Sequence, residues 1–575
     1  MRDFQRSRSL FGLLAIVALL LLPSFLSMAQ TELIVELGFE GRLTPSHYAP
    51  IRIEVINYQE TGPSRLRITQ LAGNEWRGEA TLQQELGYVV QSSGQYHAVI
   101  PIYDPVNPIV VELLSSQDVV LAQRTVDCRD AMQATPYPVL DKQLPRFDDR
   151  AAIIAPASLP TQWWGLDSAE SLWVASPLPS ETWSAISQWV LAGGSLVVLT
   201  GANFYRMDSP ALRNLIPVGN PDVMTTERGT SYLTGQYDAA TIDLLSDEGF
   251  ALLSHRRYGA GQVSLISVHA QSLSVEDLRL IAAHIVPSQL VSLEGLSEIF
   301  LGGETVVTLD SLFVLGMIAL LAILVCVCAL VGRRAPRAGW AVLMAGACLV
   351  AVLSGFVSNP ASHTVGYYTV NTYLYVQDTV SFLSVSSCYF SQTTSPFSQT
   401  LKSDIFPLQL LPRTLRGVTS FSSLTTSHQM QQRLAFGDMR RWHAYTNSSA
   451  VFDFELLSGT SVRINNYHAS GFESGWILIN GTVHPIAEVH RGNHEYVLNP
   501  AAALTMGTFL STGYTRNATS VFRLVSEMKD FLGLSKGIWL VAATDERRIE
   551  GDDIAKKVRD ITLVIARGEE DVHAN

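Results

Sequence analysis

Two long apolar stretches stand out in the pattern of hydrophobic and polar positions, and both lie near the middle of the chain. Residues 311–331 and residues 340–357 contain no charged side chain. A helix rises about 1.5 Å per residue, so roughly 20 residues cross a hydrocarbon core about 30 Å thick. The pattern therefore predicts a transmembrane helical hairpin with a short loop at 332–339, and a pair of buried soluble helices is the alternative.

The charges beside this hairpin predict its orientation. Arg333, Arg334 and Arg337 lie in the loop, which contains no acidic residue. Short loops rich in Lys and Arg stay on the cytoplasmic side of a membrane. Residues 31–310 and 358–575 are then predicted to lie together on the opposite, periplasmic side.

The N-terminus has the features of a secretory signal. Three arginines precede an apolar run at 10–22, and Ser27-Met28-Ala29 has the small-x-small form of a cleavage site. Residues 1–29 are therefore predicted to be a signal peptide, and an uncleaved signal anchor is the alternative. Both alternatives export the residues that follow.

Apolar and polar side chains alternate with a period of two in residues 30–128. The clearest examples are residues 33–37, 51–55 and 66–68, and such alternation is typical of half-buried strands. Several short strands separated by turn residues predict an antiparallel β-sandwich. A stretch with several prolines at 129–146 follows and is predicted to be a linker.

The pattern changes in residues 147–300. Residues 151–155, 171–175 and 195–199 form short, almost wholly apolar runs, and residues 181–191 have an apolar face with helical spacing. Apolar strands that alternate with helices indicate a parallel sheet covered on both faces. This region is therefore predicted to be an α/β domain.

Two motifs in this domain carry a resemblance to a known fold. They are Trp-Val-x-x-Gly-Gly-x-Leu-Val-Val-Leu at 189–199 and Tyr-Gly-x-Gly-x-Val at 258–263. With them, residues 147–300 resemble the class I glutamine-amidotransferase-like fold. The region is most similar to the degenerate versions found in bacterial membrane proteins beside β-sandwich and transmembrane segments.

The chemistry of the resembled enzymes depends on a cysteine nucleophile at a strand-to-helix turn. Residues 129–325 contain no cysteine, and no Gly-x-Ser-x-Gly elbow replaces it. We therefore expect a pseudoenzyme without catalytic residues. Such sheets bind ligands at the carboxyl ends of their strands, so Gly201, Asn203 and His269 are the candidate pocket. An ordinary surface histidine is the alternative.

The part after the hairpin, residues 358–575, is predicted to be rich in β-structure. It contains strand-like runs with many aromatic and β-branched residues, and Asn480-Gly481 has the composition of a hairpin turn. A helix is predicted at 520–532. The tyrosines at 367–375 fit the inner face of a sheet and a membrane-proximal belt, with a binding platform as the alternative.

Composition narrows the function classes. The 575 residues are 47% hydrophobic and only 16% charged, which suits an exported, β-rich multidomain chain with apolar spans. The net charge of −12 argues against nucleic acid and against adhesion to anionic lipid. No residue spacing suggests a metal or a cofactor. Cys128 and Cys388 are the exported cysteines, and two unlinked thiols or one disulfide are both open.

Together these features predict a non-catalytic protein of the bacterial cytoplasmic membrane, which acts as a scaffold or binds a partner in a cell-envelope complex. The expected partners are the lipid bilayer and an envelope protein. The resemblance implies a von Willebrand A-domain protein of a MoxR-associated system.

The alternative is an extracytoplasmic hydrolase or carbohydrate-binding protein that uses the edge of the α/β sheet. Trp163, Trp164 and Trp173 would then stack on sugar rings. Asp167 and Glu170 are the nearest carboxylates, but they match no recognisable acid–base motif.

Overall fold

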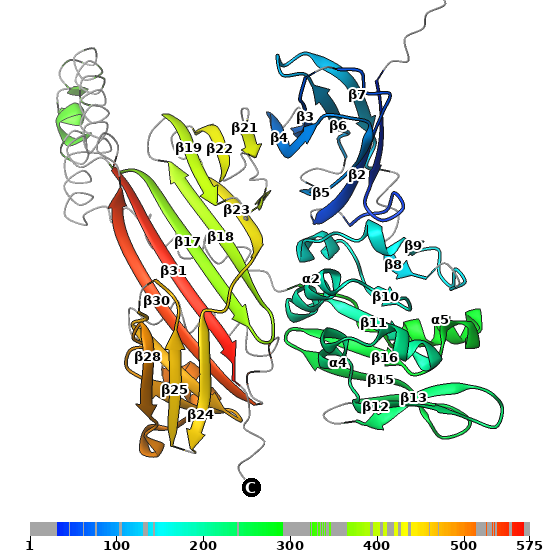
Figure 1. Cartoon of the computed structure of the whole chain (residues 1–575). Helices are drawn as coiled ribbons and strands as arrows, with labels where there is room; N and C mark the ends of the chain where they lie inside the picture. The colour runs from blue at the N-terminus through cyan, green and yellow to red at the C-terminus, as the bar shows by residue number, and fades with distance from the viewer. Residues whose placement is uncertain are drawn as a thin grey trace, which may run out of the picture.

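The computed structural model describes residues 31–290 and 365–568, apart from gaps within them, and a few positions between 323 and 346 (Figure 1). The predicted signal peptide, most of the hairpin at 311–357 and most of the helix at 520–532 lie outside these residues. In the part that the structure describes, no helix is long and apolar enough to cross a membrane. The chain is mostly β-sheet with few helices, so the prediction of a β-rich multidomain protein is confirmed.

The N-terminal lobe consists of two packed antiparallel sheets. One sheet contains β1 (Glu32–Leu37), β2 (Tyr48–Ile56) and β5 (Gly94–Pro101); the other contains β3 (Ser64–Asn74), β4 (Gly78–Val90), β6 (Ile109–Leu114) and β7 (Val120–Val126). Ile51, Ile53 and Val55 from the first sheet share a core with Ile68 and Val111 from the second. Alternation along each strand turns one face inward, because successive side chains point to opposite faces.

The second lobe contains a seven-stranded sheet in the order β14-β15-β16-β11-β10-β8-β9. Its strands are β8 (Tyr137–Leu140), β9 (Ala151–Ile153), β10 (Leu172–Val174), β11 (Ser195–Leu199), β14 (Thr241–Leu245), β15 (Ala251–Tyr258) and β16 (Gly261–Ile266). The five strands from β16 to β9 are parallel, while β15 and β14 are antiparallel. Helix α2 (Ser180–Leu191) packs on one face and α5 (Val275–His284) on the other.

Helix α2 ends where the sequence places two glycines. The N–H of Gly194 donates to Trp189 O at 2.8 Å and that of Gly193 donates to Val190 O at 3.0 Å, and Gly193 has φ +123°. This paired closure satisfies carbonyls at the helix end, and glycine adopts the required positive φ without strain. The chain then enters β11 directly.

The predicted linker at 129–146 is wrong in part. Residues Tyr137–Leu140 form β8, a fully buried strand between β10 and β9. Pro138 lacks a backbone N–H and cannot donate a ladder hydrogen bond, so its presence is unusual in a central strand. The pairing of β8 with β10 involves only Val139 and Leu140, so the proline precedes that ladder and costs it no hydrogen bond.

The third lobe is a nine-stranded sheet packed against a three-stranded sheet. The large sheet has the order β20-β23-β18-β17-β31-β30-β26-β27-β29, and the small one β24-β25-β28. Their strands are β17 (Val365–Gln377), β18 (Ser381–Ser391), β20 (Phe406–Leu410), β23 (Met439–Asn447), β24 (Phe452–Ser458), β25 (Ser461–Asn466), β26 (Ser474–Ile479), β27 (Thr482–Ile486), β28 (Gly492–Val497), β29 (Leu504–Thr505), β30 (Ile538–Glu550) and β31 (Ala555–Arg567). The predicted Asn480-Gly481 turn is confirmed, because both residues have positive φ between β26 and β27.

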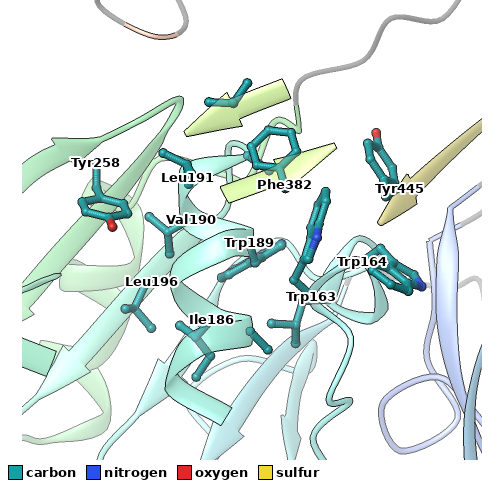
Figure 2. Close-up of a cluster of buried hydrophobic side chains, with 14 of the residues drawn as sticks. Trp163, Trp164, Ile186, Trp189, Val190, Leu191, Leu196, Tyr258, Phe382 and Tyr445 are labelled. Carbon is teal, nitrogen blue, oxygen red and sulfur yellow. The ribbon is translucent and has the colours of Figure 1, made fainter. Parts of the chain in front are cut away.

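The lobes are joined by a shared sheet and a shared core. Strand β4 pairs in parallel with β21 (Thr419–Ser423), which extends a sheet of the N-terminal sandwich through β22 (Ser427–Leu434) to β19 (Ser395–Lys402). Figure 2 shows Trp163 of the α/β lobe between α2 and two rings of the third lobe. The Trp163 ring centroid lies 5.1 Å from that of Phe382 and 4.8 Å from that of Tyr445.

Candidate functional sites

The residues predicted to line a ligand pocket meet at one edge of the α/β sheet. Gly201 and Asn203 belong to the 3-10 turn Gly201–Asn203, directly after β11. His269 follows β16, the parallel neighbour of β11, and precedes the turn Ala270–Ser272. Because parallel strands place their carboxyl ends together, the fold brings these three residues to the same edge.

The side chains of Asn203 and His269 contact each other. Asn203 Nδ2 lies 3.0 Å from His269 Nε2 and donates to Ala175 O at 3.4 Å. On the other side of the ring, the N–H of Gln271 donates to His269 Nδ1 at 3.2 Å. The imidazole therefore has a polar neighbour at each ring nitrogen, and these contacts fix its orientation. Through Ala175, Asn203 and His269, the same contacts connect the ends of β10, β11 and β16.

The backbone closes tightly around this contact. Gly201 has φ +54°, and a Cβ built on it would lie 2.4 Å from His269 N and 3.0 Å from Ser231 O. The hairpin of β12 (Gly219–Thr225) and β13 (Ser231–Gln236) lies beside it, and Leu233 N donates to Ser267 O at 2.7 Å. Only glycine fits at 201, because any side chain would collide with two backbone segments.

The three tryptophans proposed as sugar-stacking residues are buried. Trp163, Trp164 and Trp173 are 0%, 7% and 1% exposed. Trp173 packs on Phe147 with ring centroids 4.7 Å apart, and its Nε1–H donates to Ser171 Oγ at 2.9 Å. These rings belong to the core and present no face to a ligand, so the stacking prediction is wrong.

The two carboxylates of the alternative function have structural partners that the sequence did not reveal. Glu170 accepts hydrogen bonds from Arg150 Nη1 and Tyr137 Oη, both at 2.9 Å. Burial, followed by the hydrogen bond to Glu170, raises the pKa of Tyr137 well above its usual range. Asp167 lies 3.1 Å from His47 Nδ1 and accepts the N–H of Tyr48 at 3.1 Å.

Asp167 belongs to a cluster at the junction of all three lobes. Its partners His47 and Tyr48 come from the N-terminal sandwich, and His443 comes from β23 of the third lobe. Tyr48 Oη donates to His443 O at 3.5 Å. Burial lowers the pKa of His443 to about 4, with Asp167 raising it and His47 lowering it further. Sequence reasoning missed this cluster because its members lie hundreds of positions apart and form no motif.

The described surface contains cavities away from the predicted pocket. One of about 440 Å³ lies between the N-terminal and α/β lobes, where Glu36, Arg52 and His97 form a cross-strand row opposite the loop at 153–162. Another of about 300 Å³ lies on the third lobe and is lined by basic side chains. Among the residues with assigned positions, no group of three His, Cys, Asp or Glu side chains could hold a metal ion.

Cys128 and Cys388 are buried thiols in the cores of different lobes and are not joined in a disulfide. This arrangement corresponds to the unlinked alternative. A thiol buried among apolar side chains behaves as a small hydrophobic residue.

No family model and no curated protein matches the chain. Among solved structures, the chain is similar over a short part to the exo-beta-1,4-mannosidase Op5Man5 from Opitutaceae bacterium strain TAV5. The sequences are 16% identical over 23% of this chain and 26% of that chain, with a TM-score of 0.17. The matched part thus spans about a quarter of the mannosidase, and a similarity this low carries no argument about fold or activity.

Proposed function

We propose that this chain is a non-catalytic scaffold or partner-binding component of a bacterial cell-envelope complex, with its lobes acting together as one surface. The observation that carries the proposal is the apolar core that continues from the α/β lobe into the third lobe. Trp163, Trp189 and Leu196 share this core with Phe382 and Tyr445 (Figure 2). Lobes joined by a large hydrophobic interface move little against each other, as a scaffold requires.

The surroundings of the predicted pocket also support a binding role. The α/β lobe lacks the cysteine of the fold it resembles. Its histidine at the sheet edge contacts an amide and a backbone N–H. Its tryptophans are buried, and Asp167 and Glu170 hold structural partners. These features favour binding over amide or glycoside hydrolysis.

In this proposal the hairpin at 311–357 anchors the chain in the cytoplasmic membrane. Arg333, Arg334 and Arg337 face the cytoplasm, and all three lobes lie outside it. The resemblance suggests a von Willebrand A-domain protein of a MoxR-associated system as the envelope partner.

Crosslinking in intact cells, followed by mass spectrometry, tests the proposal. We expect one envelope protein crosslinked to both the α/β lobe and the third lobe. A Trp163→Ala variant should lose the simultaneous crosslinks, because it removes the ring between the lobes. A matched Tyr467→Ala variant, which truncates an exposed ring of the third lobe, should keep them.

Two results would contradict the proposal. One is that the crosslinking experiment finds no envelope protein attached to both the α/β lobe and the third lobe. The other is turnover of an amide, ester or glycoside by the purified chain that disappears in a His269→Ala variant, which would establish the enzyme alternative instead.

A further inference from the structure

A basic cavity of about 300 Å³ lies at one end of the nine-stranded sheet of the third lobe. Its lining includes Arg547 and Arg548 from β30, Lys557 and Arg559 from β31, and Tyr368 from β17. The described lining thus contains four basic residues and no carboxylate. This is a local reversal of sign in a chain whose net charge is −12.

The strand register places Arg547, Lys557 and Arg559 on one face of the sheet, while Arg548, which pairs with Val558, points to the other face. Arg547 pairs directly with Arg559 across β30 and β31, and Lys557 pairs directly with Tyr368 across β31 and β17. Like charges directly opposite each other destabilise a sheet. Lys557 Nζ lies 5.5 Å from the centroid of the Tyr368 ring, within the range of a cation–π contact.

Two carboxylates beside the cavity hold part of this set in place. Asp545 accepts from Arg559 Nε at 2.9 Å and from its Nη2 at 2.7 Å, and both side chains are 11% exposed. Arg548 Nη2 lies 3.0 Å from Asp560. The bidentate pair orients Arg559, while Arg547 and Lys557 lie on the same face of the sheet and are exposed to solvent. Guanidinium and ammonium groups recognise phosphate oxygens.

The position of the cavity along the chain suggests where the phosphate comes from. Strand β17 begins at Val365, eight residues after the predicted membrane helix ends at 357, and Tyr368 is its fourth residue. An extended chain advances about 3.3 Å per residue, so the cavity lies within roughly 40 Å of the apolar boundary at most. Tyrosine and basic residues are enriched at the headgroup level of membrane proteins.

We propose that this cavity binds the phosphate of an anionic lipid headgroup, such as that of phosphatidylglycerol, and so orients the third lobe on the membrane. The inference rests on the membrane location in the proposed function. Arg547 of β30 and Lys557 of the neighbouring strand β31 would bind the phosphate oxygens. Arg559 of β31 would add a third positive charge on the same face of the sheet. Tyr368 would lie beside the glycerol of the headgroup.

The test uses the full chain purified in a neutral detergent and read by native mass spectrometry. Short-chain phosphatidylglycerol, phosphatidylcholine of the same chain length and inorganic phosphate are titrated separately. We expect phosphatidylglycerol to bind at least tenfold more tightly than each of the other two. The double variant Arg547→Gln with Lys557→Gln should weaken that binding about tenfold or more.

Matched variants separate a specific site from general charge. Arg228→Gln with Arg463→Gln removes two exposed cations outside the cavity and should leave the affinity unchanged. Lys557→Arg keeps the charge and should retain binding. Equal affinity for phosphatidylcholine, or unchanged affinity in the double variant, would overturn the inference.

Binding of inorganic phosphate as tight as that of phosphatidylglycerol would assign the cavity to a free anion and overturn the lipid assignment. The same variants, tested by crosslinking in cells, separate this inference from the proposed function. If lipid binding fails while the envelope partner still crosslinks to both lobes, only the lipid inference falls.

Discussion

The imidazole of His443 lies fully buried between Tyr48, Tyr445 and the Asp167–His47 pair. Its folded pKa of about 4 is below the unfolded value of about 6.5, so the unfolded chain binds the extra proton first as pH falls. The contribution of neutral His443 to the free energy of unfolding is therefore complete above about pH 6.5 and is lost toward pH 4. We expect a loss of about 3 kcal/mol over this window.

Denaturant titrations at several pH values measure this effect. A His443→Gln variant should show a shallower decline in the free energy of unfolding between pH 6.5 and 4. His47→Gln, which removes a half-exposed imidazole from the same cluster, serves as the control and should keep most of the slope. An unchanged slope in His443→Gln would show that other groups cause the acid sensitivity.

Gly261 illustrates a second constraint at the scale of one residue. A Cβ on it would lie 2.3 Å from both Gly194 O and Val190 O. Val190 belongs to the last turn of α2 and Gly194 to the turn that closes it, so neither atom can move without opening that turn. We expect Gly261→Ala to lower the free energy of unfolding by about 1–3 kcal/mol. Gly94→Ala, where the new atom meets open space, should change it little in the same denaturant titration.

At the scale of elements, α2 links the sheet of the α/β lobe to the third lobe. Trp189 is 0% exposed, its ring lies against Gly194, and it shares a core with Leu196 and Val198 of β11. Truncating such a ring leaves a cavity, so Trp189→Ala should cost about 3–5 kcal/mol in unfolding free energy. Ser184→Ala on the exposed face of α2 is the matched control. A Trp189→Ala protein as stable as its parent would contradict this packing.

The elements also show which local patterns carry information. The Asn480-Gly481 turn and strand β11 were predictable, because turn composition and an apolar run act within a few residues. Strand β8 was not, since its four residues contain a proline and its neighbours β9 and β10 lie later in the chain. Short parallel strands depend on distant partners for their hydrogen bonds.

At the scale of the whole molecule, charge asymmetry predicts the topology. By this asymmetry we expect Arg333, Arg334 and Arg337 to stay in the cytoplasm and the residues on both sides of the hairpin to be exported. Reporter fusions at Gly332 and after the C-terminus should therefore report opposite compartments. The same report from both fusions would contradict a two-helix hairpin. Replacing the three arginines by glutamine should reduce the difference in reporter activity between the fusion at Gly332 and the fusion after the C-terminus.

The candidate pocket shows the same division between local and distant information. The sequence predicted that Gly201 and His269 follow strands of a parallel sheet, and the fold brings them to one sheet edge. It did not indicate that Asn203 lies beside the ring or that β13 covers this edge. The sequence around Gly201 contains no information about the β12–β13 hairpin, whose second strand begins 30 residues later and packs over this edge of the sheet.

The sequence by itself determined the strands of the sandwich, the end of α2, the apolar strand β11 and the absence of a cysteine from residues 129–325. Each of these depends on short-range periodicity, on turn chemistry or on residue identity. Only the tertiary structure decided the burial of Trp163, the cluster around His443, the pairing of β4 with β21 and the basic cavity at Tyr368. These features join residues tens to hundreds of positions apart, and their contacts arise from packing and register between lobes, which no local pattern encodes.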